Sequence, residues 1–158
     1  MRYRQLPPVG DLTDLESVYL AVPRDADETA DCCRRLCRRT TVETRTHASQ
    51  WLVFLTAVGC VSDDGAGYYR QETTLDAATL GDEFVSHVFG VPAVLAVFEA
   101  TDRALTRDEV ANRIDGRTRD RLERTDPGPV YLDRVLGWAV TLGQLTIADN
   151  GYMLSTTA

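Results

Sequence analysis

The sequence predicts a mainly helical α+β protein built from two similar halves, and the main evidence is an internal repeat. The segment Gln50–Tyr68 (QWLVFLTAVGCVSDDGAGY) aligns without gaps to Arg134–Tyr152 (RVLGWAVTLGQLTIADNGY), 84 residues further along the chain. In both segments an apolar stretch of helical length ends in glycine, and two short extended pieces flank a turn rich in Asp, Asn and Gly. A glycine directly after a helix supplies a left-handed cap, and such turns are typical of β-hairpins. Each half is therefore predicted to end in a helix followed by a hairpin.

The segments upstream of this repeat match more loosely, but they predict the same order of elements. Leu20–Leu36 aligns with Phe98–Ile114, and each contains the end of one helix, a polar break and a second helix. Thr106 and Glu109 have the spacing of a capping box, which predicts the start of that second helix. The offset here is 78, so the second half carries six additional residues, which fall in the connection GRTRDRLERTDPGP. Each half then reads helix, helix, turn, helix, hairpin.

This order resembles the winged-helix variant of the helix-turn-helix fold, over about Leu12–Arg70 and Val91–Ser155. The resemblance implies that the third helix is the recognition helix and that the hairpin is the wing. The general style is similar to that of haloarchaeal transcription regulators. We expect two tandem winged-helix domains, at residues 1–74 and 91–158, joined by a connecting helix at 75–90. Apolar residues recur at helical spacing in this connection: Leu80, Phe84, Val85, Val88 and Phe89.

The composition indicates adaptation to high salt. All 17 basic residues are arginine, aspartate outnumbers glutamate by 16 to 8, and the formal net charge is −7. These features resemble those of cytoplasmic proteins from salt-accumulating haloarchaea. A GC-rich genome would explain the missing lysine but not the excess of aspartate. In roughly 1 M salt the Debye length is about 3 Å, so the net acidity does not exclude binding to nucleic acid.

One segment of this acidic chain is strongly basic. Five arginines and one glutamate lie between Arg34 and His47, directly after two cysteines. If the segment begins as a helix, one face carries Cys32, Cys33, Leu36 and Cys37, and the opposite face carries Arg34, Arg35, Arg38 and Arg39. The pattern predicts an amphipathic second helix with cysteines pointing inward and arginines pointing outward.

The winged-helix resemblance implies a role for each part of this segment. In that fold the second helix crosses the DNA backbone and the third helix enters the major groove. The four arginines of the second helix would then contact phosphates, and the start of the third helix would present three exposed side chains to the DNA: Arg45, His47 and Gln50. The alternative is a solvated arginine face that pairs with nearby acids such as Glu28 and Asp31.

These observations predict a DNA-binding protein, most simply a transcription regulator, with double-stranded DNA as its partner and a homodimer as its functional form. The third helix of the second half offers few side chains that could contact phosphate, so that half is expected to serve dimerisation or to bind a protein partner. The alternative function is a tandem winged-helix adaptor that binds protein and does not read DNA. The basic face of the first half favours DNA binding, because an adaptor does not need it.

Other classes of function find no support in the sequence. It contains no Walker A motif, G-x-S-x-G or H-E-x-x-H, so we expect neither an enzyme nor a bound cofactor. Cys33 and Cys37 lie four residues apart in the predicted helix, which is poor spacing for zinc, and no metal is expected. Buried thiols are favoured for the cysteines, with a redox switch as the alternative. The apolar runs are too short to span a bilayer and no signal peptide is evident, so a cytoplasmic location away from membranes is expected.

Overall fold

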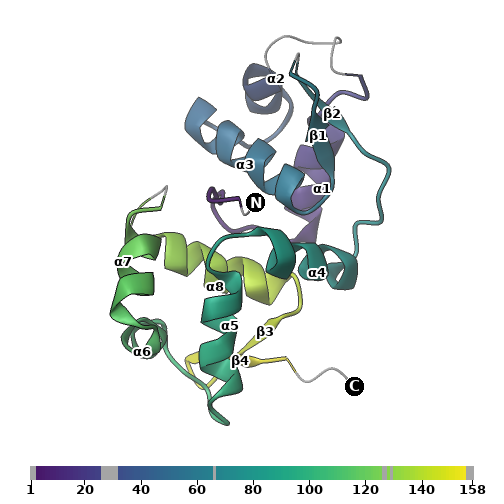
Figure 1. The fold of residues 1–158 in the computed structure, drawn as a ribbon. Coiled ribbons are helices and arrows are strands. Elements are labelled where there is room, and N and C mark those ends of the chain that lie inside the picture. Colours follow the sequence, from purple (N-terminus) through teal and green to yellow (C-terminus); the bar gives the residue numbers. More distant parts are fainter. Residues whose placement is uncertain (1–2, 26–31, 66, 126–127, 129, 156–158) are drawn as a thin grey trace.

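The computed structural model describes residues 3–25, 32–65, 67–125, 128 and 130–155 (Figure 1). The first half contains α1 (Leu12–Ala21), α2 (Cys32–Arg39), α3 (Arg45–Ala57), β1 (Val61–Asp63) and β2 (Tyr68–Arg70). Helix α4 (Ala77–His87) follows. The second half contains α5 (Val91–Glu99), α6 (Arg107–Arg113), α7 (Gly116–Glu123), α8 (Tyr131–Thr141), β3 (Leu145–Ala148) and β4 (Gly151–Leu154). The mainly helical α+β architecture expected from the sequence is confirmed.

The same hydrogen-bonded cap ends α3 and α8. Gly59 follows α3 with φ 80° and Gly143 follows α8 with φ 76°, both in the left-handed region that favours glycine. The next amides, those of Cys60 and Gln144, each donate to the carbonyl five residues earlier, at 2.8 Å in both halves. This is the cap that the paired glycines predicted, and it directs the chain from each helix into a strand.

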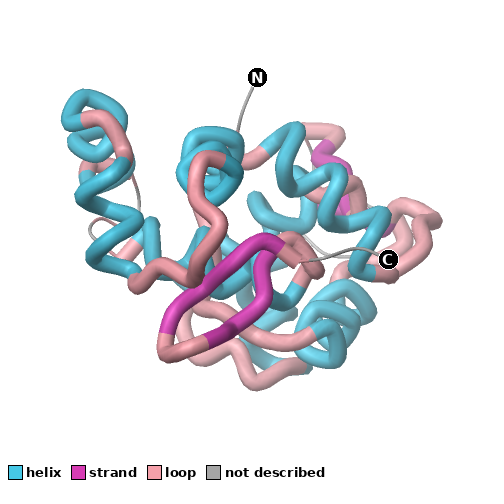
Figure 2. The backbone as a smooth tube through the Cα atoms, turned by 90° about the horizontal axis from the view of Figure 1, so that it is seen from below, coloured by secondary structure: helices cyan, strands magenta, loops and turns pink. Residues whose placement is uncertain are grey.

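Both hairpins are antiparallel, and in each a side-chain hydrogen bond links equivalent positions. The side chain of Gln71 donates to Ser62 Oγ at 2.6 Å, and the hydroxyls of Thr146 and Ser155 lie 2.9 Å apart at the equivalent positions. The β3–β4 hairpin turns at two residues with positive φ, as a tight two-residue turn requires. Figure 2, which views the molecule from below, shows β3–β4 across the near face and β1–β2 on the far side.

Helix α7 distinguishes the second half from the first. The connection in which the additional residues fall contains this helix, which lies between α6 and α8, whereas the described residues between α2 and α3 form only a short turn. Asp115 caps α7 by accepting from the Arg117 amide at 3.0 Å. The helix buries Leu122, which lies close to Gly90. The two halves are therefore similar in order but not identical in composition.

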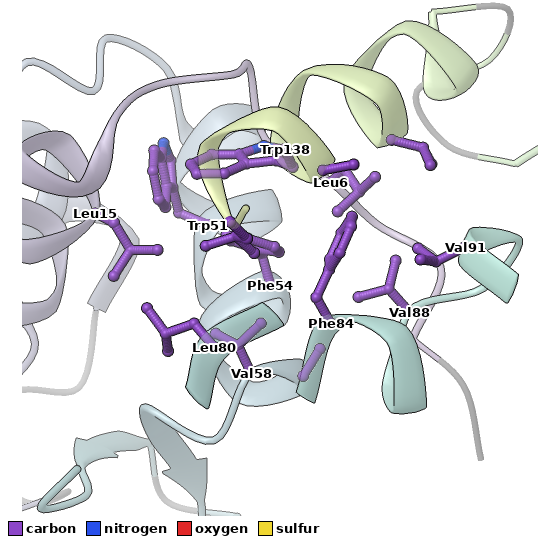
Figure 3. Packing of buried hydrophobic residues seen from close by; sticks show 14 of the residues in the cluster. Leu6, Leu15, Trp51, Phe54, Val58, Leu80, Phe84, Val88, Val91 and Trp138 are labelled. Atoms are coloured by element: carbon purple, nitrogen blue, oxygen red, sulfur yellow. The ribbon is translucent and has the colours of Figure 1, made fainter. Parts of the chain in front are cut away.

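The hydrophobic core runs through both halves without a break (Figure 3). The rings of Phe54 in α3 and Trp138 in α8 lie 4.5 Å apart between centroids, and Trp51 meets Trp138 edge-on at 5.3 Å. Phe84 of α4 joins the same cluster, 6.3 Å from Phe54. Phe54 and Trp138 are equivalent positions of the repeat, so α3 and α8 contact each other through matching residues.

The connecting helix α4 is part of this core and does more than link the halves. It begins at Ala77 and ends at His87, within the expected 75–90 range, and it buries Leu80, Gly81 and Phe84. A side chain at Gly81 would meet the Leu142 carbonyl oxygen at 2.7 Å. The helix therefore approaches the end of α8 more closely than a residue with a β-carbon would allow.

The N-terminal segment, residues 3–10, lies between the two halves and is held by α8. Trp138 Nε1 donates to the Pro7 carbonyl at 3.1 Å, and Thr141 Oγ1 donates to the Gly10 carbonyl at 2.8 Å. Tyr3 pairs with the end of α4 through backbone hydrogen bonds. Although this segment precedes the first helix in sequence, much of its attachment is to the second half.

Candidate nucleic-acid interface

Helix α2 presents two chemically different faces, as its sequence predicted. Cys32 and Leu36 are buried, and Cys33 and Cys37 are half-buried against the core. On the other side, the side chains of Arg34, Arg38 and Arg39 are exposed. We call these three residues the arginine face. Burial of the apolar stripe fixes the rotation of the helix, and this rotation directs the three guanidinium groups to solvent.

Arg35 departs from the expected role as a phosphate contact. Its side chain is half-buried, and its Nε donates to the carbonyl of Ala21, the last residue of α1, at 2.6 Å. The final carbonyls of a helix have no partner within the helix, so a side-chain donor from elsewhere stabilises them. Arg35 therefore anchors α2 to α1 and is not part of the arginine face.

Two of the three residues of the arginine face, Arg38 and Arg39, have no acidic partner in the described part of the chain. No carboxylate of the described residues lies within ion-pair distance of Arg38 or Arg39. The acids considered as alternative partners, Glu28 and Asp31, lie outside the described residues. By contrast, two arginines of the second half are paired, since Arg103 and Arg107 contact carboxylates at 2.7 and 2.8 Å.

The start of α3 is exposed beside α2. Thr44 caps the helix by accepting from the His47 amide at 3.1 Å. Arg45, Thr46 and Ser49 are exposed along the first turns. Thr46 and Ser49 were not among the residues expected at the interface. Ser49 lies four residues after Arg45 and three after Thr46, which makes it a neighbour of both on the helix surface.

His47 is half-buried rather than exposed. It lines a cavity of about 550 Å³ between α1, the N-terminal segment and the turn from α2 to α3. Arg39 and Trp51 line the same cavity. A ring in this position can contribute to the shape of the surface, but it does not project freely from α3 as the sequence led us to expect.

The expectation that Gln50 is exposed at the DNA interface is wrong. Only 2% of Gln50 is accessible, and its Oε1 accepts from Arg134 Nη1 at 3.0 Å. The same guanidinium nitrogen donates to the Leu6 carbonyl at 2.8 Å. Gln50 is therefore bonded to the second half and is too deeply buried to present its side-chain amide to a base edge.

The equivalent helix of the second half is closed at its start. Tyr131 and Leu132, the first residues of α8, are buried, and Tyr131 donates its hydroxyl proton to the Phe89 carbonyl at 2.6 Å. Burial also raises the pKa of the Tyr131 phenol, so it stays protonated. Helix α7 packs against α8, and the exposed charge in the first turn of α8 is the acid Asp133. This helix start is therefore not basic, and its first two residues are buried.

The described residues show no arrangement for metal binding around the cysteines. Among them, no group of three or more His, Cys, Asp or Glu side chains is placed to hold a metal ion. Cys60 is buried, and this burial raises the pKa of its thiol to about 12, so it stays protonated at physiological pH. No helix in the described part of the chain is long and apolar enough to cross a membrane.

Three successive helices followed by a hairpin in the first half, and the same elements with α7 added in the second, define a winged-helix protein. The chain belongs to the family described as the halobacterial double winged helix domain, whose match covers residues 1–158. No curated protein and no solved structure matched the chain. The family agrees with the haloarchaeal winged-helix resemblance found in the sequence.

Proposed function

We propose that the protein binds double-stranded DNA through its first winged helix and acts as a transcription regulator. The observation that carries the proposal is the exposed arginine face of α2, a helix that packs against α3 and is joined to its exposed start by a short turn. Arg38 and Arg39 reach solvent without a carboxylate partner among the described residues, in a chain whose net charge is −7. Guanidinium groups in this position can contact phosphate oxygens, and an arginine at the start of a recognition helix, such as Arg45, can contact base edges.

The two halves have different roles in this proposal. The first half reads DNA because its recognition helix is open at the start. The second half supports the first through the shared core. It does not read DNA, because α7 packs against α8 and because Arg103 and Arg107 of this half are already paired with carboxylates. Each chain then contributes one recognition helix to DNA binding, so recognition of a palindromic site requires a homodimer.

Binding to duplex DNA at several salt concentrations tests the proposal. We expect the logarithm of the affinity to fall linearly with the logarithm of the salt concentration, because phosphate contacts release counterions. Arg38→Ala or Arg39→Ala should weaken binding to all duplexes equally and reduce this slope by about 0.9 for each phosphate that is no longer neutralised. Glu43→Ala, which removes an exposed acid from the same region, is the control and should not weaken binding.

The competing function is an adaptor that binds protein. The observation in its favour is the β3–β4 hairpin, which carries no arginine and leaves Ile147 66% exposed. If the wild-type chain shows no salt-dependent affinity for any duplex, and the arginine variants behave like wild type, the DNA-binding proposal fails and the adaptor becomes the better interpretation.

A further inference from the structure

We infer that the DNA-binding surface continues from α3 across the N-terminal segment to α7, where Arg4, Arg121 and Arg124 form a second site for the phosphate backbone. This inference rests on the proposed function and extends it to residues outside the first winged helix. The arginines of α7 alternate with acids along the chain, a pattern typical of a solvated charged surface, so the sequence gives them no role in binding.

Two neighbouring cavities form the path. One, of about 370 Å³, is lined by Arg4, Gln5, Arg121, Arg124 and Thr125. The other, also of about 370 Å³, is lined by Gln5, Cys33, Arg45, Thr46, Ser49 and Gln50. Gln5 lines both cavities, so the hollow beside the exposed start of α3 adjoins the hollow beside α7. A DNA backbone that passes Arg45 and continues along the same surface would therefore meet the arginines of the second cavity.

The aromatic ring of Phe89 holds two of the three arginines in position. The guanidinium carbon of Arg4 lies 4.6 Å from the ring centroid, and that of Arg121 lies 5.7 Å from it. Cation–π contacts of this kind orient a guanidinium group without neutralising its charge. The Phe89 carbonyl accepts from Tyr131, which ties the base of the site to α8. The arginines are therefore organised by the fold, although they come from segments far apart in sequence.

The charges of this second site are not balanced within the described part of the chain. No described carboxylate lies within ion-pair distance of Arg4, Arg121 or Arg124, all of which are exposed. Elsewhere in the second half, Arg103 and Arg107 have acidic partners. Three cations that converge on one hollow repel one another, and an anion with several oxygens would relieve this repulsion. A phosphodiester chain satisfies this requirement and matches the donors of guanidinium groups.

Site-directed variants of the full chain test the second site in the duplex-binding assay. We expect Arg121→Ala and Arg124→Ala each to weaken binding several-fold, by the same factor for all sequences, and to lower the salt slope by about 0.9. Arg121→Lys should retain part of the affinity, because it keeps the charge. Arg113→Ala is the matched control: Arg113 is also an exposed arginine of the second half, but it lines a different cavity and donates to Thr101.

The pattern of weakened binding separates this inference from the proposed function. If Arg38→Ala and Arg39→Ala weaken binding while Arg121→Ala and Arg124→Ala match Arg113→Ala, the second site is overturned and the first winged helix remains the DNA-binding module. If only Arg121→Ala and Arg124→Ala weaken binding, the second site stands and the proposed arginine face is wrong. A wild-type chain that binds no duplex overturns both. Equal thermal midpoints for all variants show that a weaker affinity does not reflect unfolding.

Discussion

Gln50 and Arg134 occupy equivalent positions of the internal repeat, 84 residues apart, and they are hydrogen-bonded to each other at 3.0 Å. Phe54 and Trp138, which are also equivalent, have ring centroids 4.5 Å apart. In a twofold-symmetric dimer, residues near the axis meet their own counterparts. The two halves of this chain are thus paired through their third helices in the manner of a dimer interface, with one polar contact and one aromatic contact between matching positions.

The hydrogen bond between Gln50 and Arg134 leads to a prediction about stability and specificity. Gln50→Ala should lower the free energy of unfolding by about 1–3 kcal/mol, because the Arg134 guanidinium is deprived of a partner in a partly buried position. The base preference of the protein should not change, because Gln50 is not accessible to DNA. Urea unfolding in high salt measures the first effect, and binding to a set of duplexes measures the second. A changed base preference would restore Gln50 to the interface.

The shared aromatic cluster predicts that the two halves unfold together. Trp138→Ala should cost about 3–5 kcal/mol, since Trp138 is fully buried against residues of both halves. Far-UV circular dichroism and tryptophan fluorescence of the wild type should report one coincident transition. A fragment ending at residue 74 should not keep the native fold, because it would expose Trp51 and Phe54. Two separate transitions would show that the halves are independent domains.

Two glycines predict opposite effects of the same substitution. Gly81→Ala should destabilise the protein by about 1–3 kcal/mol, because the new β-carbon would meet the Leu142 carbonyl oxygen at 2.7 Å. Gly116→Ala, at the start of α7, should be neutral or stabilise by up to about 1 kcal/mol, since nothing lies within 4 Å of the added carbon. Thermal unfolding of both variants checks the prediction. Equal effects at the two sites would mean that α4 does not approach α8 closely in solution.

Arg45 should differ from Arg38 in how it affects DNA binding. Arg45→Ala is expected to reduce discrimination at one base position by about 1–3 kcal/mol, because arginine can contact a guanine edge with two hydrogen bonds. Arg38→Ala should weaken binding without changing the preferred sequence. Selection of bound duplexes from a random pool, followed by sequencing, distinguishes the two outcomes. A preferred sequence that survives Arg45→Ala unchanged would place base recognition elsewhere.

The four cysteines should differ in reactivity. Cys60 should resist alkylation at about pH 8, because burial raises the pKa of its thiol to about 12 and limits access by the reagent. The half-buried Cys33 and Cys37 should be modified first. Mass spectrometry after brief treatment with N-ethylmaleimide gives the order, and a denatured sample provides the control in which all four react. Early modification of Cys60 would contradict the buried position.

The sequence alone determined the local features of this protein. The paired glycines Gly59 and Gly143 specified the ends of α3 and α8, because few other residues adopt the left-handed cap. The capping box of Thr106 and Glu109 specified the start of α6. The alternation of cysteine and arginine fixed which side of α2 faces the core. Each of these features depends on residues within a few positions of one another, so a short window of the chain is enough to predict it.

How the two halves meet is visible only in the folded chain. Gln50 is a polar residue near the start of a recognition helix, and nothing in its neighbourhood along the chain indicates that Arg134 reaches it. The same holds for Arg4, which joins Arg121 around Phe89 although the three lie in separate segments. Such contacts depend on the packing of distant segments, and their energies are absent from any local window of sequence. Which polar residues lie at the surface therefore depends on the folded structure, whereas the internal repeat is enough to predict the fold class.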